Sequence, residues 1–450
     1  MTVRGHAGAA ASLGVPLIGS NLALIAIGIS DTVMVGWYDV KSLAAIVLAG
    51  AYYFVIFIFG TGFGNAVMPL VAEAAGAGND VRVRRITRMG IWISLLFSVI
   101  TLPMFMCSGS ILKFLGQDPE VADLAQQYLR IAGLGVVPSL LIMVLKSYLS
   151  ALERTAILFW GGLIAVPMNI IVNYCLIFGH WGLPELGIRG AAVASLSTQM
   201  ISVVVLTVYI SLFVKRHALF TRLWRPEWPV FVRVFRLGWP IGLTMLAQVG
   251  LFAASTVMVG WVGLKDLAAH GIAIQLASIT FMIQMGFSGV ATVRSGRAFG
   301  SGDAHGLRVG ARVILAMAVC FAILAGMVFL KFPEPLTGLF LASDEPARPA
   351  IIATGSLLLV YAALFQLVDA FQSTAMGLLR GLQDARAPML IAAVSYWLVG
   401  CPTSLILSRF VGWGTPGVWI GLIVGLSCAA ILLNYRFWAV VLPRKTRRIA

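Results

Sequence analysis

The residues of this sequence best placed to do chemistry are ionisable and amide side chains inside long apolar segments. Asp31 adjoins the first such segment, Lys146 the fourth and Asp369 the tenth. An ionisable group in apolar surroundings costs free energy, so each of the three is a candidate functional residue. Asn169 and Asn173 lie four residues apart in the fifth segment and would share one face of a helix. With a carboxylate nearby, their amide oxygens could bind a hard cation, or they could join neighbouring helices.

Each of the three charges also has a structural interpretation. Asp31 could be a solvated cap near the end of its helix, and Asp369 could make a hydrogen bond to neighbouring backbone. Lys146 could extend its amino group along the helix toward the cytoplasmic surface. The residue types alone leave these alternatives open.

Composition identifies the solvent in which these segments lie. The chain has 450 residues, of which 60% are apolar and only 11% are charged, and its mean hydropathy is +0.95. Soluble proteins carry roughly 25% charged residues, so a water-soluble enzyme is close to excluded. The five histidines are mostly terminal or in loops, and the five cysteines are scattered singly. We therefore expect a membrane protein that is not an enzyme and needs no cofactor.

A membrane-spanning helix needs about 20 predominantly apolar residues, and the chain contains twelve such stretches. They are Ala7–Ser30, Ser42–Ala72, Met89–Leu112, Ile131–Leu145, Thr155–Gly179, Gly190–Val214, Leu237–Leu264, Gly271–Val293, Val313–Leu330, Pro349–Val368, Ala387–Ser408 and Phe410–Tyr435. The fourth and tenth must extend past Lys146 and Asp369 to be long enough. The sequence therefore predicts an all-α polytopic membrane protein with twelve transmembrane helices.

Basic residues predict the orientation of these helices. The formal net charge is +15, and 23 of the 32 Lys and Arg residues lie at the termini or in connections after even-numbered helices. Basic segments stay in the cytoplasm, so we expect both termini there, in a bacterial inner membrane. The excess positive charge then indicates contact with membrane lipid and not with nucleic acid.

The two halves of the chain repeat each other. Thr32–Trp37 reads Thr-Val-Met-Val-Gly-Trp, and Thr256–Trp261 repeats it 224 residues later. Matches at this one offset continue over some 75 positions, so the sequence predicts two pseudo-symmetric lobes of six helices, 1–214 and 231–450, joined by a cytoplasmic linker at 215–230. Parallel repeats of this kind are typical of transporters whose halves rock about a central site.

The repeat does not extend to the two carboxylates of the apolar segments. Ser255 stands at the position equivalent to Asp31, and Ser139 at the position that matches Asp369. Whatever the two carboxylates do, the two halves do it differently.

Several pieces of sequence, taken in order, resemble the multidrug and toxic compound extrusion (MATE) transporters. They are Pro69–Ala72 with Gly76-Ala77-Gly78, Pro167–Tyr174, Gly182–Gly187 with Gly190, Asp369–Gly377 with Leu379-Arg380-Gly381, and Gly417–Leu422. The similarity covers essentially the whole chain and is closest to the NorM-like branch. It implies a monomer that exports cationic or amphipathic drug-like small molecules by alternating access of its lobes, in exchange for Na⁺ or H⁺.

The resemblance also implies two sites. In the first lobe it assigns cation coupling to Asp31, Asn169, Asn173 and Ser195, with Na⁺ expected at the first three. In the second lobe it places Asp369 in the cavity, where NorM-like members pair this aspartate with a glutamate. That glutamate is replaced here by Gln248, which carries neither charge nor proton, so we expect coupling to reside mainly at Asp31.

Two alternatives remain at this point. A major facilitator transporter also has twelve spans, and Gly78-Asn79-Asp80 with Arg84-Arg85 faintly matches a loop of that family. A flippase for lipid-linked precursors, from the same broad superfamily as MATE proteins, is the second, although such proteins often have fourteen spans.

Overall fold

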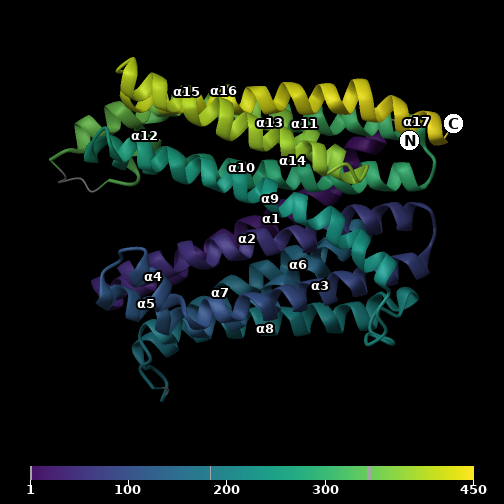
Figure 1. Cartoon of the computed structure of the whole chain (residues 1–450), viewed down its shortest axis with the longest axis horizontal. Coiled ribbons are helices and arrows are strands. Elements are labelled where there is room, and N and C mark those ends of the chain that lie inside the picture. The colour runs from purple at the N-terminus through teal and green to yellow at the C-terminus, as the bar shows by residue number, and fades with distance from the viewer. Residues whose placement is uncertain (1–2, 183, 342–345, 450) are drawn as a thin grey trace. The chain divides into compact units, whose positions relative to one another are not determined.

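The protein was analysed as a computed structural model, which describes residues 3–182, 184–341 and 346–449. The described residues form helices and connecting turns, and twelve of the helical segments are long and apolar enough to cross a membrane (Figure 1). The predicted all-α fold with twelve spans is confirmed. The fourth span is longer than expected: it begins at Pro119 instead of Ile131 and ends at Ala151.

Val15–Gly242 form one compact unit, called here the amino-terminal unit. Its helices are α1 (Val3–Tyr38, from Val15 on), α2 (Val40–Gly76), α3 (Asp80–Met106), α4 (Ser108–Phe114), α5 (Pro119–Ala132), α6 (Val136–Ala151), α7 (Ala156–Phe178), α8 (Ile188–Phe213) and the first part of α9 (Trp228–Gly260). A short 3₁₀ turn, Gly133–Gly135, joins α5 to α6 and makes the two helices one span.

Met1–Gly14 and Leu243–Ala450 form the second compact unit, called here the carboxy-terminal unit. Beyond the rest of α9 it contains α10 (Leu264–Gly300), α11 (Ala304–Lys331), α12 (Pro333–Gly338), α13 (Arg348–Gly381), α14 (Arg386–Ala393), α15 (Cys401–Leu405), α16 (Gly414–Tyr435) and α17 (Leu442–Ile449). The last four helices form two spans: the π-helical segment Val394–Gly400 joins α14 to α15, and the π-helical segment Arg436–Val441 joins α16 to α17. A further π-helical segment, Ile406–Phe410, ends the first of these spans.

The first half of α9 belongs to the amino-terminal unit because it packs closely on α2. A β-carbon at Gly62 of α2 would collide with the backbone of Gly238 and Gly242 in α9. Next to this contact the rings of Phe63 and Phe235 stack with their centroids 5.5 Å apart. Glycine at these three positions therefore lets the two helices approach to backbone contact.

The connection before α9 is also fastened to this unit. Arg88 of α3 donates from Nε to the carbonyl of Leu219 at 2.9 Å, and Trp92 donates from its indole nitrogen to the carbonyl of Leu223 at 2.8 Å. The units therefore divide inside α1 and α9, whereas the lobes expected from the sequence divide at 215–230.

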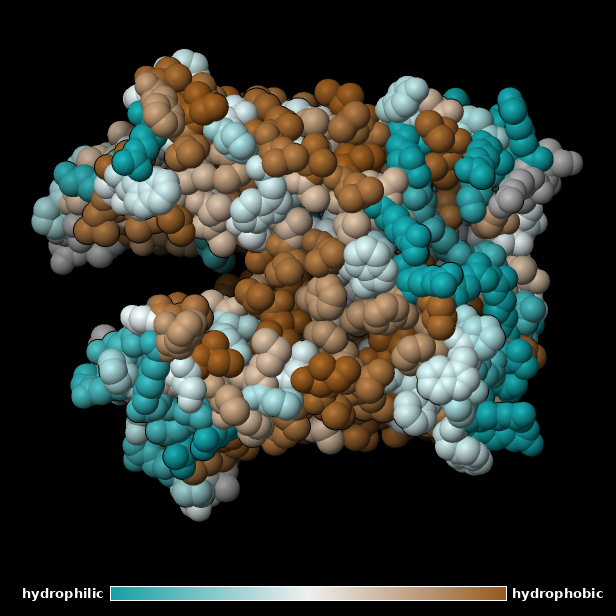
Figure 2. Space-filling view, viewed as in Figure 1, coloured by the Kyte–Doolittle hydropathy of each residue, from teal (hydrophilic) through white to brown (hydrophobic). Residues whose placement is uncertain are grey.

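The helices present apolar flanks and polar ends. Figure 2 shows hydrophobic residues along the helices and hydrophilic residues gathered at their ends. In α7 the side chains of Ile164 and Ile171 are 63% and 50% exposed, while Asn169 and Asn173 are fully buried. A helix with an exposed apolar flank and a buried polar flank fits a membrane, where lipid takes the place of water.

Candidate cation site

Asp31 lies at the centre of a buried polar cluster in the amino-terminal unit. α1 continues past it to Tyr38, and Asp31 is only 8% exposed. Asn173 of α7 donates from Nδ2 to Asp31 Oδ1 at 2.6 Å, and Ser195 of α8 donates from Oγ to Asp31 Oδ2 at 2.5 Å. Asn173 also donates to Asn169 Oδ1 at 3.1 Å. The structure thus brings together all four residues expected at this site and excludes the solvated-cap interpretation of Asp31.

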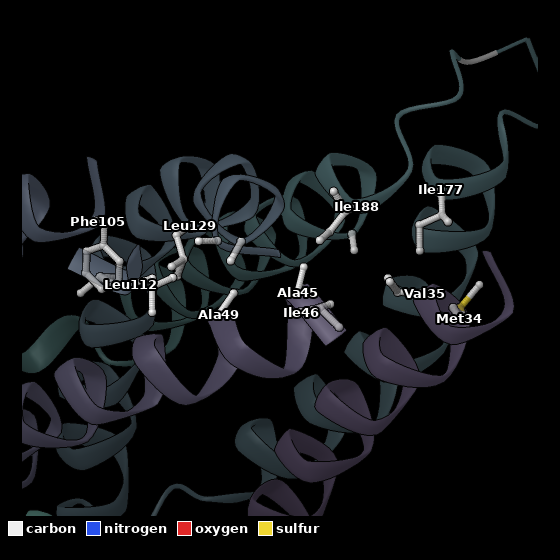
Figure 3. Close-up of a cluster of buried hydrophobic side chains, with 14 of the residues drawn as sticks. Met34, Val35, Ala45, Ile46, Ala49, Phe105, Leu112, Leu129, Ile177 and Ile188 are labelled. Carbon is white, nitrogen blue, oxygen red and sulfur yellow. The ribbon is translucent and has the colours of Figure 1, made fainter. Parts of the chain in front are cut away.

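An apolar layer one helical turn away sets the relative position of the three helices. Val35, Ile177 and Ala191 lie four residues from Asp31, Asn173 and Ser195 respectively, and each is fully buried in the same apolar cluster. Figure 3 shows Val35 of α1 and Ile177 of α7 in this cluster. Because residues four apart share a helix face, packing of this layer aligns the polar residues beneath it.

The cluster presents oxygen atoms around a carboxylate that has no basic partner in the described part of the chain. Among the described residues, both oxygens of Asp31 accept hydrogen bonds from neutral groups, and the ion pairs of this unit lie elsewhere. The buried Asn173 Oδ1 has no hydrogen-bond partner in the described part of the chain. Carboxylate, amide and hydroxyl oxygens suit a hard cation, and the carboxylate alone suits a proton.

The second carboxylate, Asp369, lies fully buried in α13 of the carboxy-terminal unit. Ser373, one turn further along the helix, donates to Asp369 Oδ1 at 2.9 Å. Within the described ranges, Asp369 Oδ2 has no partner, and no hydrogen bond joins the half-buried Gln248 of α9 to this carboxylate. The hydrogen bond to Asp369 therefore comes from a side-chain hydroxyl and not from backbone.

Polar residues near Asp369 in the chain escaped the sequence analysis. Gln372 donates from Nε2 to the hydroxyl of Tyr396 at 2.5 Å, and Gln366 donates to the carbonyl of Ala277 at 3.3 Å. Both glutamines are buried. Gln366 and Gln372 each lie three residues from Asp369, which places all three on one helix face. This spacing could have identified the two glutamines from the sequence.

The MatE family profile matches residues 16–175 and 240–406, which begin 224 residues apart. The chain belongs to the MatE family. The two matched segments coincide with the two halves of the internal repeat. Membership makes the chain a multi-pass membrane transporter and not an enzyme, and it excludes the major facilitator alternative.

Two similar proteins align with nearly the whole chain. The "Probable multidrug resistance protein NorM" of Rhizobium meliloti (strain 1021) is 45% identical over 438 residues, which cover 97% of this chain and 94% of the relative. A protein of the same name from Synechocystis sp. is 34% identical over 440 residues, covering 97% and 95% of the two chains. The expected similarity to the NorM-like branch of MatE is confirmed.

Solved structures of MATE transporters share the fold. The eukaryotic MATE transporter AtDTX14 has a TM-score of 0.88 at 19% identity and covers 99% of this chain and 98% of its own. A multidrug resistance MATE transporter of the MOP superfamily in an outward-facing conformation has a TM-score of 0.87 at 17% identity, with 99% and 96% covered.

The repeat positions of this MatE chain show how its two halves differ. Ser255, equivalent to Asp31, donates its hydroxyl to the carbonyl of Phe252 at 2.7 Å. Ser139, which matches Asp369, lies 3.3 Å from the hydroxyl of Tyr53. Among the residues that the structure describes, each unit thus holds one buried carboxylate, and the two are at non-equivalent positions.

Proposed function

We propose that this chain is a multidrug efflux transporter that exports cationic or amphipathic organic compounds in exchange for Na⁺ or H⁺. The observation that carries the proposal is Asp31, a buried carboxylate whose partners within the described ranges are neutral side chains. A bare carboxylate inside a membrane protein is costly, so it must take up a cation or a proton. The names of the relatives, which are multidrug resistance proteins, support drug-like compounds as the cargo.

The proposed mechanism is alternating access of the two lobes. The coupling ion, entering from outside, binds at Asp31 with Asn169, Asn173 and Ser195 as its neutral ligands or hydrogen-bond donors. The drug enters from the cytoplasm and favours the other arrangement of the lobes, so that each ligand shifts the same two-state equilibrium in the opposite direction. Asp369 serves in the carboxy-terminal unit as a counter-ion for cationic cargo or as a second proton carrier.

The proposal includes location and assembly. The transporter lies in the bacterial inner membrane as a monomer in contact with membrane lipid, with both termini in the cytoplasm. The basic connections after even-numbered helices support this orientation through the positive-inside rule.

Export measured in cells tests the function. A strain without its own exporters is loaded with a fluorescent cationic dye, and dye retention is followed with and without this protein at varied external Na⁺ and pH. We expect retention to fall when the protein is present, and to depend on one of the two gradients. Dye retention that is insensitive to the protein under both gradients contradicts drug export and favours a lipid-linked precursor flippase.

A further inference from the structure

His270 is a buried histidine that the proposed export cycle does not use. It follows the start of α10 at Leu264 by six residues, within a helix and not in a loop, and its side chain is fully buried in the carboxy-terminal unit. The equivalent position in the first half of the repeat, 224 residues earlier, is Ile46, which lies in an apolar cluster. Packing at this position of the fold therefore does not require a histidine.

The hydrogen bonds of His270 define which ring nitrogen carries the proton. Trp419 of α16 donates from Nε1 to His270 Nδ1 at 3.1 Å. An indole nitrogen can only donate, so Nδ1 is an acceptor and the proton of the neutral ring is on Nε2. His270 Nε2 lies 3.4 Å from Thr256 Oγ1 in α9, and this hydroxyl donates in turn to the carbonyl of Phe252. A neutral imidazole of defined tautomer thus joins α9, α10 and α16.

A second proton on this ring is incompatible with the present position of Trp419. The proton would bind at Nδ1, the atom to which Trp419 donates, and two donors cannot form a hydrogen bond with each other. The indole N–H would then lose its acceptor in a buried position, since Trp419 is 1% exposed, and a buried donor without a partner is costly. Protonation of His270 therefore requires Trp419 to move.

Trp419 links His270 to the helix that carries Asp369. Its ring packs edge-on against Phe365 of α13, with centroids 6.2 Å apart. Phe365 is buried and lies one helical turn before Asp369, so the two residues share a helix face. Phe365 also packs against the ring of Phe252 in α9, with centroids 5.9 Å apart. A movement of Trp419 would therefore act on α13 one turn from its buried carboxylate.

A second contact between α10 and α16 lies one turn nearer the start of both helices. Thr415 donates its hydroxyl to Asp266 Oδ1 at 2.9 Å, and these residues precede Trp419 and His270 by four positions each. One turn is a rise of roughly 6 Å. Asp266 is half-buried, so its carboxylate can exchange protons with water and deliver one to the imidazole. In the orientation proposed above, this end of the unit faces the outside.

Few charges surround this histidine. The part of α9 after Leu243 and the whole of α16 contain no acidic or basic residue. In the described part of the chain, the ion pairs do not include His270. The ionisable residues of the other neighbouring helices are Lys265 and Asp266 in α10, Tyr361 and Asp369 in α13, and Cys401 in α15. The hydrogen bonds of the ring and its burial therefore decide whether it binds a proton.

We propose that His270 is a further proton-binding site, through which the external pH acts on the carboxy-terminal unit. A proton from outside passes by way of Asp266 to His270 Nδ1, the hydrogen bond from Trp419 breaks, and the imidazolium keeps its bond to Thr256. The indole ring then moves against Phe365. This inference goes beyond the proposed function, because the site is separate from Asp31 whichever ion binds there, and it relies on that function only for the effect on export.

Titration of histidine signals by NMR tests proton binding without transport. The protein is prepared in detergent with ¹³C-labelled histidine, and the His270 signal among the five histidines is the one that is missing in His270→Gln. We expect this signal to titrate between about pH 8 and about pH 4.5. Trp419→Phe keeps a ring beside Phe365 but removes the donor to Nδ1, so the midpoint should rise by about one pH unit.

A variant on the other side of the ring should have the opposite effect. Thr256→Val removes the acceptor for Nε2–H, and a charged donor makes the stronger hydrogen bond, so the protonated ring loses more and the midpoint should fall. A general loosening of the unit would move both midpoints in the same direction. Shifts of equal sign in Trp419→Phe and Thr256→Val would therefore overturn the inference, as would a His270 signal in the native protein that does not titrate in this range.

Dye export at graded external pH tests the effect on transport. We expect His270→Gln, whose amide can still accept from Trp419 but does not titrate, to lose part of the response of export to external pH. His180→Gln is the matched control, since His180 is exposed and stacks on Tyr174 in the amino-terminal unit, and it should keep the native response. Identical responses of the native protein and His270→Gln would overturn the link to transport.

Failure of the proposed function gives a different result. In that case the native protein exports no dye at any external pH, while the His270 signal still titrates and its midpoint still moves in opposite directions in Trp419→Phe and Thr256→Val. Export by the native protein without a titrating His270 signal contradicts the proton-binding site alone.

Discussion

Asn173 donates a 2.6 Å hydrogen bond to Asp31, across 142 residues of chain. The bond joins α7 to α1 between two buried side chains, where water does not compete for either group. It also leaves Asn173 Oδ1 beside the carboxylate without a partner among the described residues. One amide thus both positions Asp31 and offers an oxygen to an incoming cation.

Replacing that amide tests its part in ion binding. Asn173→Leu removes the donor to Asp31 and the spare oxygen while keeping a side chain of similar size. We expect the concentration of coupling ion for half-maximal dye export to change by about tenfold, because an unpaired buried group costs about 1–3 kcal/mol. Export measured against graded Na⁺ and graded pH in inverted vesicles checks this. An unchanged midpoint in both series contradicts the role given to Asn173.

Two serines on α8 form a matched comparison. Ser195 donates to Asp31 Oδ2, whereas Ser197 donates to the carbonyl of Val193 in its own helix at 2.7 Å. Ser195→Ala should shift the midpoint of ion-driven export in the same direction as Asn173→Leu, and Ser197→Ala should leave it in place. Equal shifts in the two alanine variants would mean that α8 is sensitive to any lost hydroxyl.

In the carboxy-terminal unit, we expect substitution of Asp369 to reduce the rate of dye export far more than substitution of Gln248. Asp369 is fully buried and hydrogen-bonded to Ser373, while no described hydrogen bond links it to Gln248. We expect Asp369→Asn to lower the initial rate of cationic dye export strongly, since it removes the embedded charge. Gln248→Ala should change that rate by no more than about twofold, as expected where no specific interaction is lost. Similar reductions of the export rate in Asp369→Asn and Gln248→Ala would contradict these different roles.

The connection before α9 contains a histidine that predicts a dependence of stability on pH. Nδ1 of His217 lies 2.7 Å from the hydroxyl of Tyr148, and its Nε2 lies 3.3 Å from Asp80 Oδ1. Burial lowers the pKa of His217 below its usual 6.5, against the opposing effect of Asp80; Arg216 and Arg154 act with burial. The neutral ring accepts from Tyr148 and donates to Asp80.

A lowered histidine pKa makes the unfolded state bind more protons than the folded state in the window just below pH 6.5. The stability contributed by His217 is therefore complete above that pH and falls as the pH drops through the folded-state value. Thermal unfolding in detergent between pH 7.5 and 5 should show this loss in the native protein and a smaller one in His217→Gln. Parallel curves for the two proteins would exclude His217 as the source.

The sequence predicts much of this molecule because the membrane restricts what its segments can do. Twelve apolar stretches can only be spanning helices, and Asp31, Asn169 and Asn173 stand out because polar groups there are rare. The position of Ser195 beside Asp31 required the family resemblance, since a serine in an apolar helix most often bonds its own backbone, as Ser197 does.

Other features depend on contacts between residues far apart in the chain, which cannot be predicted from residue types alone. Residues 228–242 group with the amino-terminal unit because the backbone of Gly62 closely approaches that of Gly238 and Gly242. Such an approach depends on how two helices pack, which a single sequence does not show. The bond between Lys146 and Asn21 joins residues 125 positions apart. The described residues also include no hydrogen bond between Gln248 and Asp369, and this depends on how α9 and α13 face each other.

The most direct test of the account is ion-coupled export by Asp31→Asn in reconstituted vesicles. The variant keeps the size of the side chain and its oxygen toward Asn173 but removes the charge. Dye transport is measured under an imposed Na⁺ gradient and, separately, an imposed pH gradient, beside the native protein at equal reconstituted amounts. The account predicts that the native protein responds to one of the gradients and that Asp31→Asn loses that response while still binding dye. Gradient-driven transport by Asp31→Asn at the native rate would contradict the assignment of coupling to Asp31.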